Sequence, residues 1–175
     1  KQKMGLKNKF IILGVASQWS NSKGLNKFIE ISDMLNEDMV IILVGNISSE
    51  IKLPNNIISI KETHNVNHLV QYYSMADVLI NFSLEESFGK VSAEALACGT
   101  PIITYNSTAN PELVGDGCGY ILDKNDCCGV MKSIIKTYKR GKTLNSKKCI
   151  AFANSNFNKE QRILDYYNLY KKISN

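Results

Sequence analysis

Two glutamates separated by seven residues, Glu86 and Glu94, are the strongest candidates for chemistry in this sequence. Glu86 stands four residues after an apolar run that ends at Phe82, which predicts a position in the crevice at the end of a buried strand. Glu94 takes the i+3 place in a helical apolar stripe, so it is expected on the core-facing side. The stripe consists of Val91, Ala95 and Cys98. A carboxylate there needs a hydrogen-bonding partner. A ligand diol such as a ribose is one candidate, and a buried backbone donor or a lysine is the other.

Two segments of the sequence are suited to hold an anion. Ser87, Phe88 and Gly89 precede a predicted helix, where free backbone N–H groups and the helix dipole attract negative charge. In the small polar segment 14–24, Lys23 stands just before another helix and could provide a point charge for a phosphate. The segment matches neither the dinucleotide fingerprint nor the P-loop, so a solvated lysine is equally consistent with it.

The number and spacing of the histidines and cysteines do not indicate a metal site. His64 and His68 are the only histidines, and no third ligand stands near them, so we expect surface side chains. The five cysteines are odd in number and form no CxxC pair, which favours reduced thiols. Tyr72 and Tyr73 fall within a predicted helix and are expected to pack in the core.

Predicted strands and helices alternate along the chain. Continuous apolar runs rich in Ile and Val are typical of strands buried on both faces of a parallel sheet. They cover residues 10–13, 39–44, 57–60, 78–82 and 101–105, with a short sixth strand at 120–122. Helical patterns cover 25–35, 66–76, 90–98, 126–138, 141–154 and 159–173. The sequence therefore predicts an α/β fold: a Rossmann-like, doubly wound parallel sheet of about six strands with helices on both faces and a C-terminal helical tail.

Two helix ends have a local signal. Gly99 is expected in the left-handed conformation that ends a helix, and Pro101 prevents its continuation. The cluster from Asn154 to Asn156 is expected to separate the last two helices.

Composition sets limits on the class of protein. The length of 175 residues predicts one domain over 1–175, and 44% hydrophobic with 21% charged residues is ordinary for a globular chain. The net charge is 21 − 16 = +5, which suits an anionic small ligand. The lysines are scattered, so no nucleic-acid partner is expected. No apolar run approaches the roughly 18 residues of a membrane span, and the N-terminus lacks the apolar region of a signal peptide. A cytoplasmic protein is expected.

The segment from Glu86 to Ile103 resembles the E-x7-E motif, with its following helix and strand, of retaining glycosyltransferases with the GT-B fold, the large group called family four. Other similarities occur in the same order along the chain. They are Lys23-Gly24, the segment from Tyr73 to Val78, Pro111 to Val114, Gly117 to Tyr120, and the closing helix from Phe157 to Tyr170.

This resemblance implies one half of a two-domain enzyme. The chain is similar to the C-terminal, nucleotide-sugar-binding half, and the helix at 155–175 is expected to cross to an N-terminal acceptor domain. The resemblance implies that Glu86 is the catalytic contact to the donor sugar and that Glu94 binds the ribose hydroxyls. The donor sugar and phosphates would be held by Lys23, Gly14, Ser87, Phe88, Gly89 and Lys90, and the base by Ile60, Lys61 and Thr63. It implies no metal ion and no other cofactor.

The implied reaction moves a sugar from a nucleotide-diphosphate sugar to a glycan or lipid-linked acceptor, with retention, in bacterial surface polysaccharide synthesis. The isolated half is expected to be inactive, and the full-length protein to reach the inner face of the plasma membrane peripherally. The chain departs from the family at two places: Val15 stands where an Arg is common, and Thr108-Ala109-Asn110 where Gly-Gly is common.

Two alternatives remain open. One is another GT-B enzyme, of the sugar-nucleotide epimerase type. The other is a non-catalytic nucleotide-binding module with a flavodoxin-like sheet. That module would need acidic residues after the first strand, where this sequence has Lys23 and no acid.

Overall fold

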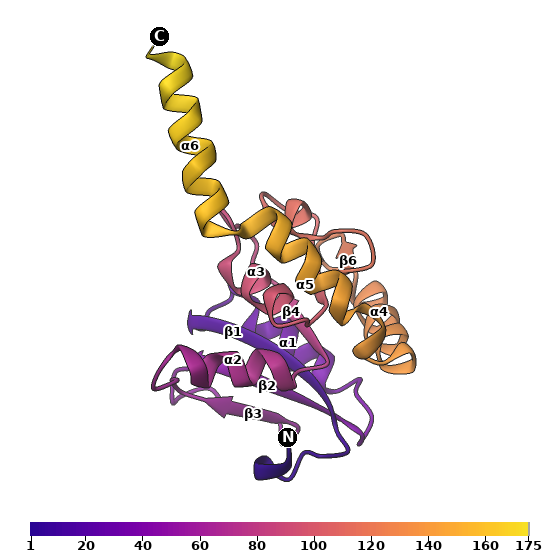
Figure 1. The fold of residues 1–175 in the computed structure, drawn as a ribbon. Coiled ribbons are helices and arrows are strands. Elements are labelled where there is room, and N and C mark those ends of the chain that lie inside the picture. The colour runs from indigo at the N-terminus through magenta and orange to yellow at the C-terminus, as the bar shows by residue number, and fades with distance from the viewer. Residues whose placement is uncertain (175) are drawn as a thin grey trace.

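Six parallel strands form one sheet in the order β3-β2-β1-β4-β5-β6 in a computed structural model that describes residues 1–174 (Figure 1). The strands are β1 (Phe10–Gln18), β2 (Met39–Asn46), β3 (Ile57–Ile60), β4 (Val78–Asn81), β5 (Ile102–Tyr105) and β6 (Gly119–Leu122). The helices are α1 (Leu25–Ser32), α2 (Val66–Met75), α3 (Lys90–Ala97), α4 (Cys127–Arg140), α5 (Thr143–Phe157) and α6 (Lys159–Ile173). Short 3₁₀ turns cover Gln2–Met4 and Asn110–Leu113. The predicted Rossmann-like fold is confirmed.

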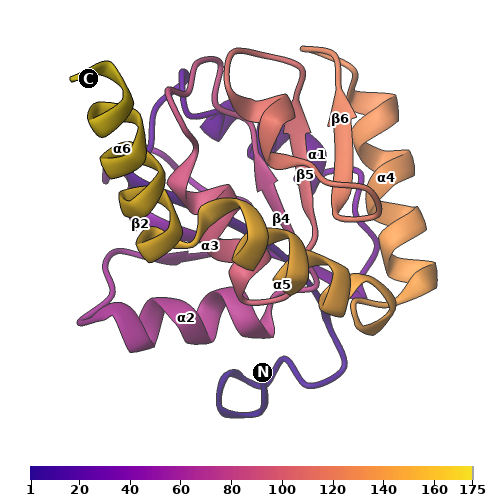
Figure 2. The same ribbon diagram turned by 45° about the horizontal axis from the view of Figure 1, so that its top comes forward.

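Helices cover both faces of this sheet because successive strand residues point to opposite sides. Ile11 and Leu13 of β1 belong to one core cluster, together with side chains of α2, α3 and α5. Phe10 and Ile12 belong to a second cluster, with side chains of α1 and α4. Figure 2 shows α2, α3 and α5 together in front of the strands. The strand order reverses between β1 and β4, and a crevice for ligands is expected there in sheets of this kind.

Most element boundaries differ from the sequence prediction by one to three residues, and the ends of β1 and α5 have a clear structural cause. Strand β1 continues to Gln18, because β2 offers pairing partners as far as Asn46. The predicted break at Asn154–Asn156 is wrong: α5 continues through it to Phe157. The Asn156 amide donates to the carbonyl of Phe152 at 2.9 Å, within the helix, instead of competing with it. The two helices are separated at Asn158 instead, and the side chain of Asn158 caps α6. Gly99 is left-handed, with φ 73°, as predicted.

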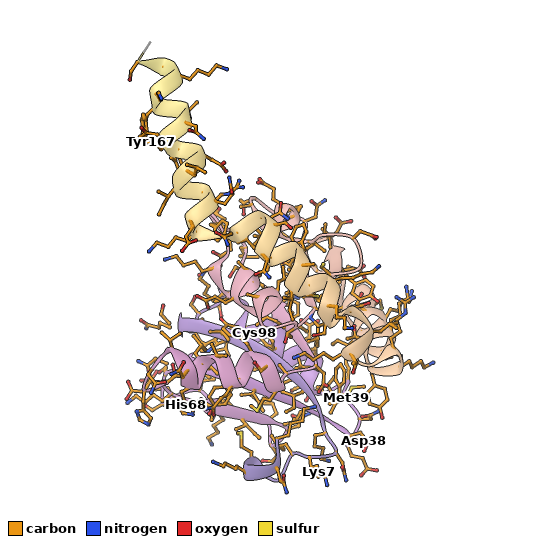
Figure 3. The ribbon with its side chains drawn as sticks, viewed as in Figure 1. Lys7, Asp38, Met39, His68, Cys98 and Tyr167 are labelled. Carbon is orange, nitrogen blue, oxygen red and sulfur yellow. The ribbon has the colours of Figure 1, made fainter. Side chains whose placement is uncertain are left out.

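Helix α6 extends away from the body of the domain (Figure 1), and Tyr167 marks its middle in Figure 3. None of its residues is buried. Its large apolar side chains are exposed: Ile163, Leu164, Tyr166, Tyr167, Leu169, Tyr170 and Ile173. Within residues 1–174, no helix combines the length and the apolar character needed to span a membrane.

Candidate functional site

The candidate site lies where β1 and β4 end and where α1 and α3 begin. Each of these helices starts directly after a left-handed glycine, Gly24 with φ 79° and Gly89 with φ 83°. A side chain at Gly24 would place its Cβ 2.2 Å from the Cβ of Phe82, just past the end of β4. Glycine therefore allows the start of α1 to pack directly against the end of β4, which brings the two predicted segments together.

Lys23 and Glu86 meet at this junction, although 63 residues separate them. The Lys23 Nζ lies 2.7 Å from Glu86 Oε1 and 3.3 Å from the hydroxyl of Ser83. The side chain of Glu86 is only 16% exposed, and that of Lys23 is 39% exposed. Two residues predicted for the donor site therefore meet beyond the ends of β1 and β4 as a paired cation and carboxylate.

The segment in place of the Gly-Gly pair fixes the backbone of Glu86. The Glu86 N–H donates to the hydroxyl of Thr108 at 2.9 Å, and the Ala109 N–H donates to the carbonyl of Glu86 at 3.3 Å. Thr108 itself has a positive φ of 49°, which is rare for a β-branched residue. This loop therefore takes the conformation that glycine would adopt, and it adds a side-chain hydrogen bond.

The start of α3 presents backbone donors that lack partners. None of the N–H groups of residues 87–91 donates a hydrogen bond to another described residue. By contrast, side chains cap the starts of α2, α4 and α6, namely those of Asn65, Asp126 and Asn158. Ser87 and Lys90 are exposed at this start, and Phe88 packs edge-to-face on Phe157 at 5.6 Å. The free donors predicted at Phe88, Gly89 and Lys90 are present, and such a helix start can bind an anion.

Glu94 is exposed, and the expectation that it faces the core is wrong. The buried face of α3 is instead formed by Ser92, Ala93, Ala95 and Leu96, while Val91 and Cys98 are only partly buried. The carboxylate still has a partner, since Glu94 Oε2 accepts a hydrogen bond from the Tyr73 hydroxyl at 2.7 Å. Glu94 also lines a cavity of about 290 Å³ between α3 and α5, together with Phe88 and Lys90.

The residues predicted for a nucleobase lie at and after the end of β3. Ile60 and Thr63 are half-buried and Lys61 is exposed. Lys61 lines a cavity of about 620 Å³ that Trp19 and Asn46 also line. The sequence analysis did not single out Trp19, although it is the only tryptophan and follows the first strand directly. Its indole N–H donates to the carbonyl of Val44 at 3.1 Å, which fixes the ring at the edge of this cavity.

Gly14 has a packing role in the structure. It lies within β1, paired with Leu43, and it is buried. A Cβ at this position would come within 2.8 Å of the side chains of Phe28, Leu43 and Trp19. Its glycine identity is therefore explained by close packing under α1, and a contact of Gly14 with phosphate stays a prediction. The neighbouring Val15 is half-buried.

The histidines and cysteines form no evident metal site within residues 1–174. The rings of His64 and His68 stack at 5.7 Å, and no cluster of three His, Cys, Asp or Glu side chains suited to a metal ion occurs in residues 1–174. The cysteines are free thiols. Burial, with the neighbouring Cys118, raises the pKa of Cys149 to about 12.

Comparison with known proteins places the chain in a family. A family described as glycosyl transferases group 1 matches residues 1–155. D-inositol 3-phosphate glycosyltransferase of Mycolicibacterium vanbaalenii is 44% identical over 61 residues, which are 34% of this chain and 14% of that protein. O-antigen chain mannosyltransferase B of Escherichia coli is 35% identical over 65 residues, 37% of this chain and 17% of that protein.

Solved structures show the same fold. Anabaena HepE in complex with UDP and glucose superposes with a TM-score of 0.76 and 22% identity, over 95% of this chain and 50% of HepE. Sucrose-phosphate synthase of Thermosynechococcus elongatus gives a TM-score of 0.82 and 19% identity, over 98% of this chain and 47% of the synthase. The chain thus spans about half the length of these structures, and less of its curated relatives. With the family matched over residues 1–155, the chain belongs to the group 1 glycosyltransferases.

Proposed function

We propose that this chain is the donor-binding half of a retaining glycosyltransferase that moves a sugar from a nucleoside-diphosphate sugar to a glycan or lipid-linked acceptor. The observation that carries the proposal is the Lys23–Glu86 pair next to the unpaired N–H groups of residues 87–91. They lie at the strand ends, where a ligand crevice is expected. A diphosphate needs positive charge and several donors, and this crevice offers both.

The chemistry assigned to the crevice is stabilisation of the leaving group. When the bond between the sugar and the diphosphate breaks, negative charge develops on the phosphate oxygens. Lys23 and the N–H groups at the start of α3 would stabilise that charge, because both are held in place before reaction. Diphosphate binding would draw Lys23 from Glu86 and leave this carboxylate for the hydroxyls of the donor sugar. The proposal assigns no metal ion and no further cofactor.

The other parts of the nucleotide have candidate contacts nearby. Glu94 would accept hydrogen bonds from the ribose hydroxyls, since its Oε1 has no partner within residues 1–174. The base would occupy the cavity lined by Lys61 and Trp19. The solved relative named above holds UDP and glucose, which supports a nucleoside diphosphate as the ligand class here.

The acceptor side of the reaction is proposed to lie on a second domain. HepE is about twice as long as the part that matches this chain, and the unpaired apolar face of α6 is suited to contact such a domain. Relatives include the O-antigen mannosyltransferase and a protein of the cps region of Klebsiella pneumoniae, 33% identical over 107 residues. These relatives support a role in bacterial surface polysaccharide synthesis. We expect no sugar transfer by this chain alone.

Calorimetric titration with UDP, GDP and ADP tests the proposal. We expect one of the three to bind, which would also identify the base. Failure of all three to bind at millimolar concentration would contradict donor binding by this chain.

A further inference from the structure

The hydroxyl of Tyr73 reaches the candidate site from the core. Tyr73 lies on α2 and is 1% exposed, and its ring belongs to the core cluster beneath α2 and α3. Packing of the ring confirms what the sequence predicted. The hydroxyl, however, donates to Glu94 Oε2 at 2.7 Å, across 21 residues of sequence. The core tyrosine is thus linked to the carboxylate proposed to bind ribose.

The backbone of Tyr73 is fixed as well. Its carbonyl accepts a hydrogen bond from the Thr100 hydroxyl at 2.6 Å, and the Lys142 ammonium lies 3.4 Å away. Lys142 also donates to the carbonyl of Ser74 and to the Thr100 hydroxyl, each at 2.7 Å. The end of α2 is therefore tied to the turn before β5 and to the start of α5, which leaves the tyrosine ring little freedom to move.

Glu94 depends on such a partner because it lies on an exposed face of α3. A free glutamate there would sample several rotamers, and ligand binding would have to immobilise it. The hydrogen bond to Oε2 selects one orientation and leaves Oε1 as an acceptor. Burial and the neighbouring Glu94 raise the pKa of Tyr73, so the hydroxyl keeps the proton that it donates.

We propose that Tyr73 is a positioning residue that holds the Glu94 carboxylate ready for the two hydroxyls of the nucleotide ribose. This inference rests on the proposed function, since it assumes that Glu94 meets a nucleotide. Tyr73 itself touches no part of the ligand. Its removal should therefore affect only ligands that carry ribose hydroxyls.

The test compares a nucleotide with its 2′,3′-dideoxy analogue, which lacks both ribose hydroxyls. Calorimetry would use whichever of UDP, GDP and ADP binds the unmutated chain, together with the dideoxy form of the same nucleotide. The variants are Tyr73→Phe and, as the matched control on the same helix, Tyr72→Phe. Tyr72 is also buried, and its hydroxyl makes no hydrogen bond to any described residue. A third comparison places Tyr73→Phe in a Glu94→Ala background.

We expect Tyr73→Phe to weaken nucleotide binding by roughly three- to tenfold and to leave binding of the dideoxy analogue unchanged. Unchanged analogue binding would also show that the variant is folded. Tyr72→Phe should change neither affinity, and Tyr73→Phe should have no further effect once Glu94 is alanine.

If Tyr73→Phe weakened binding of both ligands equally, or weakened binding of neither, the positioning role would be overturned while donor binding would stand. Failure of the unmutated chain to bind any of the three nucleotides would overturn the proposed function, and this inference with it.

Discussion

At the level of single residues, the site contains a cation and a carboxylate that are paired with each other and that a ligand would have to separate. Lys23 and Glu86 neutralise each other at 2.7 Å, and both are only partly exposed. A diphosphate would compete with Glu86 for the ammonium group. The same pair thus provides a cation for the phosphates and a carboxylate for the sugar.

Replacement of Lys23 by methionine should weaken binding of a nucleoside diphosphate by about tenfold, because one charged contact to phosphate is lost. Binding of the corresponding nucleoside, which has no phosphate, should stay unchanged. Calorimetry with whichever of UDP, GDP and ADP binds, and with the corresponding nucleoside, measures both. Lys27→Met is the control, since Lys27 lies one turn further along and pairs with Glu30 at 2.9 Å. Equal losses in the two variants would point to general surface charge instead.

Replacement of Glu94 by alanine should leave the fold intact, because the side chain is exposed. Nucleotide affinity should fall by roughly 1–3 kcal/mol, since the ribose hydroxyls would lose a charged acceptor. The exposed Glu160→Ala serves as the control in the same titration. Unchanged affinity in folded Glu94→Ala would remove the assignment of ribose to Glu94.

At the scale of elements, the site depends on how closely two helix starts approach the sheet. Gly24→Ala should destabilise the fold by about 1–3 kcal/mol, because the new Cβ adds a clash with Phe82 to the cost of a left-handed alanine. Gly5→Ala is the matched control: Gly5 is left-handed like Gly24, with φ 68° and ψ 13°, and no atom lies within 4 Å of its Cβ position. Urea unfolding of both variants separates the clash from the backbone strain. Equal losses of stability would show that packing at Gly24 contributes nothing.

The elements themselves were largely predictable from the sequence. Buried strands are continuous apolar runs, so their positions could be predicted from the hydrophobic pattern along the sequence. The alternation of strands with helices indicated that the strands run parallel. The placement of Lys23 and Glu86 at one edge of the sheet could also be expected, because both come after strand ends, but their ion pair was not predicted.

Features that depend on packing between elements could not be predicted. The extension of β1 to Gln18 depends on its pairing with β2. The exposure of Glu94 depends on which neighbours cover α3, because burial falls on Ser92, Ala93, Ala95 and Leu96 and not on the whole predicted stripe. The Tyr73–Glu94 hydrogen bond depends on the approach of α2 to α3, and nothing in the local sequence of either helix indicates it.

At the level of the whole molecule, the fold buries some cysteines away from solvent and leaves others exposed. Cys149 and Cys118 are 0% and 1% exposed, and burial raises the pKa of both thiols. Cys128 is exposed at the start of α4. Iodoacetamide at pH 8 should therefore modify Cys128 first and leave Cys118 and Cys149 unmodified until the chain unfolds. Peptide mass spectrometry after timed labelling reads this order. Early labelling of Cys149 in the folded chain would contradict the burial of this thiol in the core cluster beneath α5.

The molecule as a whole presents a charged pair and free N–H donors beyond the ends of β1 and β4, together with a protruding helix, α6, none of whose residues is buried. The central claim is that the crevice binds a nucleoside diphosphate at the start of α3. Nuclear magnetic resonance of the ¹⁵N-labelled chain during titration with UDP, GDP and ADP tests it most directly. We expect one nucleotide to cause its largest amide shifts at residues 87–91, whose N–H groups lack partners within residues 1–174. Shifts confined to other parts of the chain, or none at millimolar nucleotide, would contradict it.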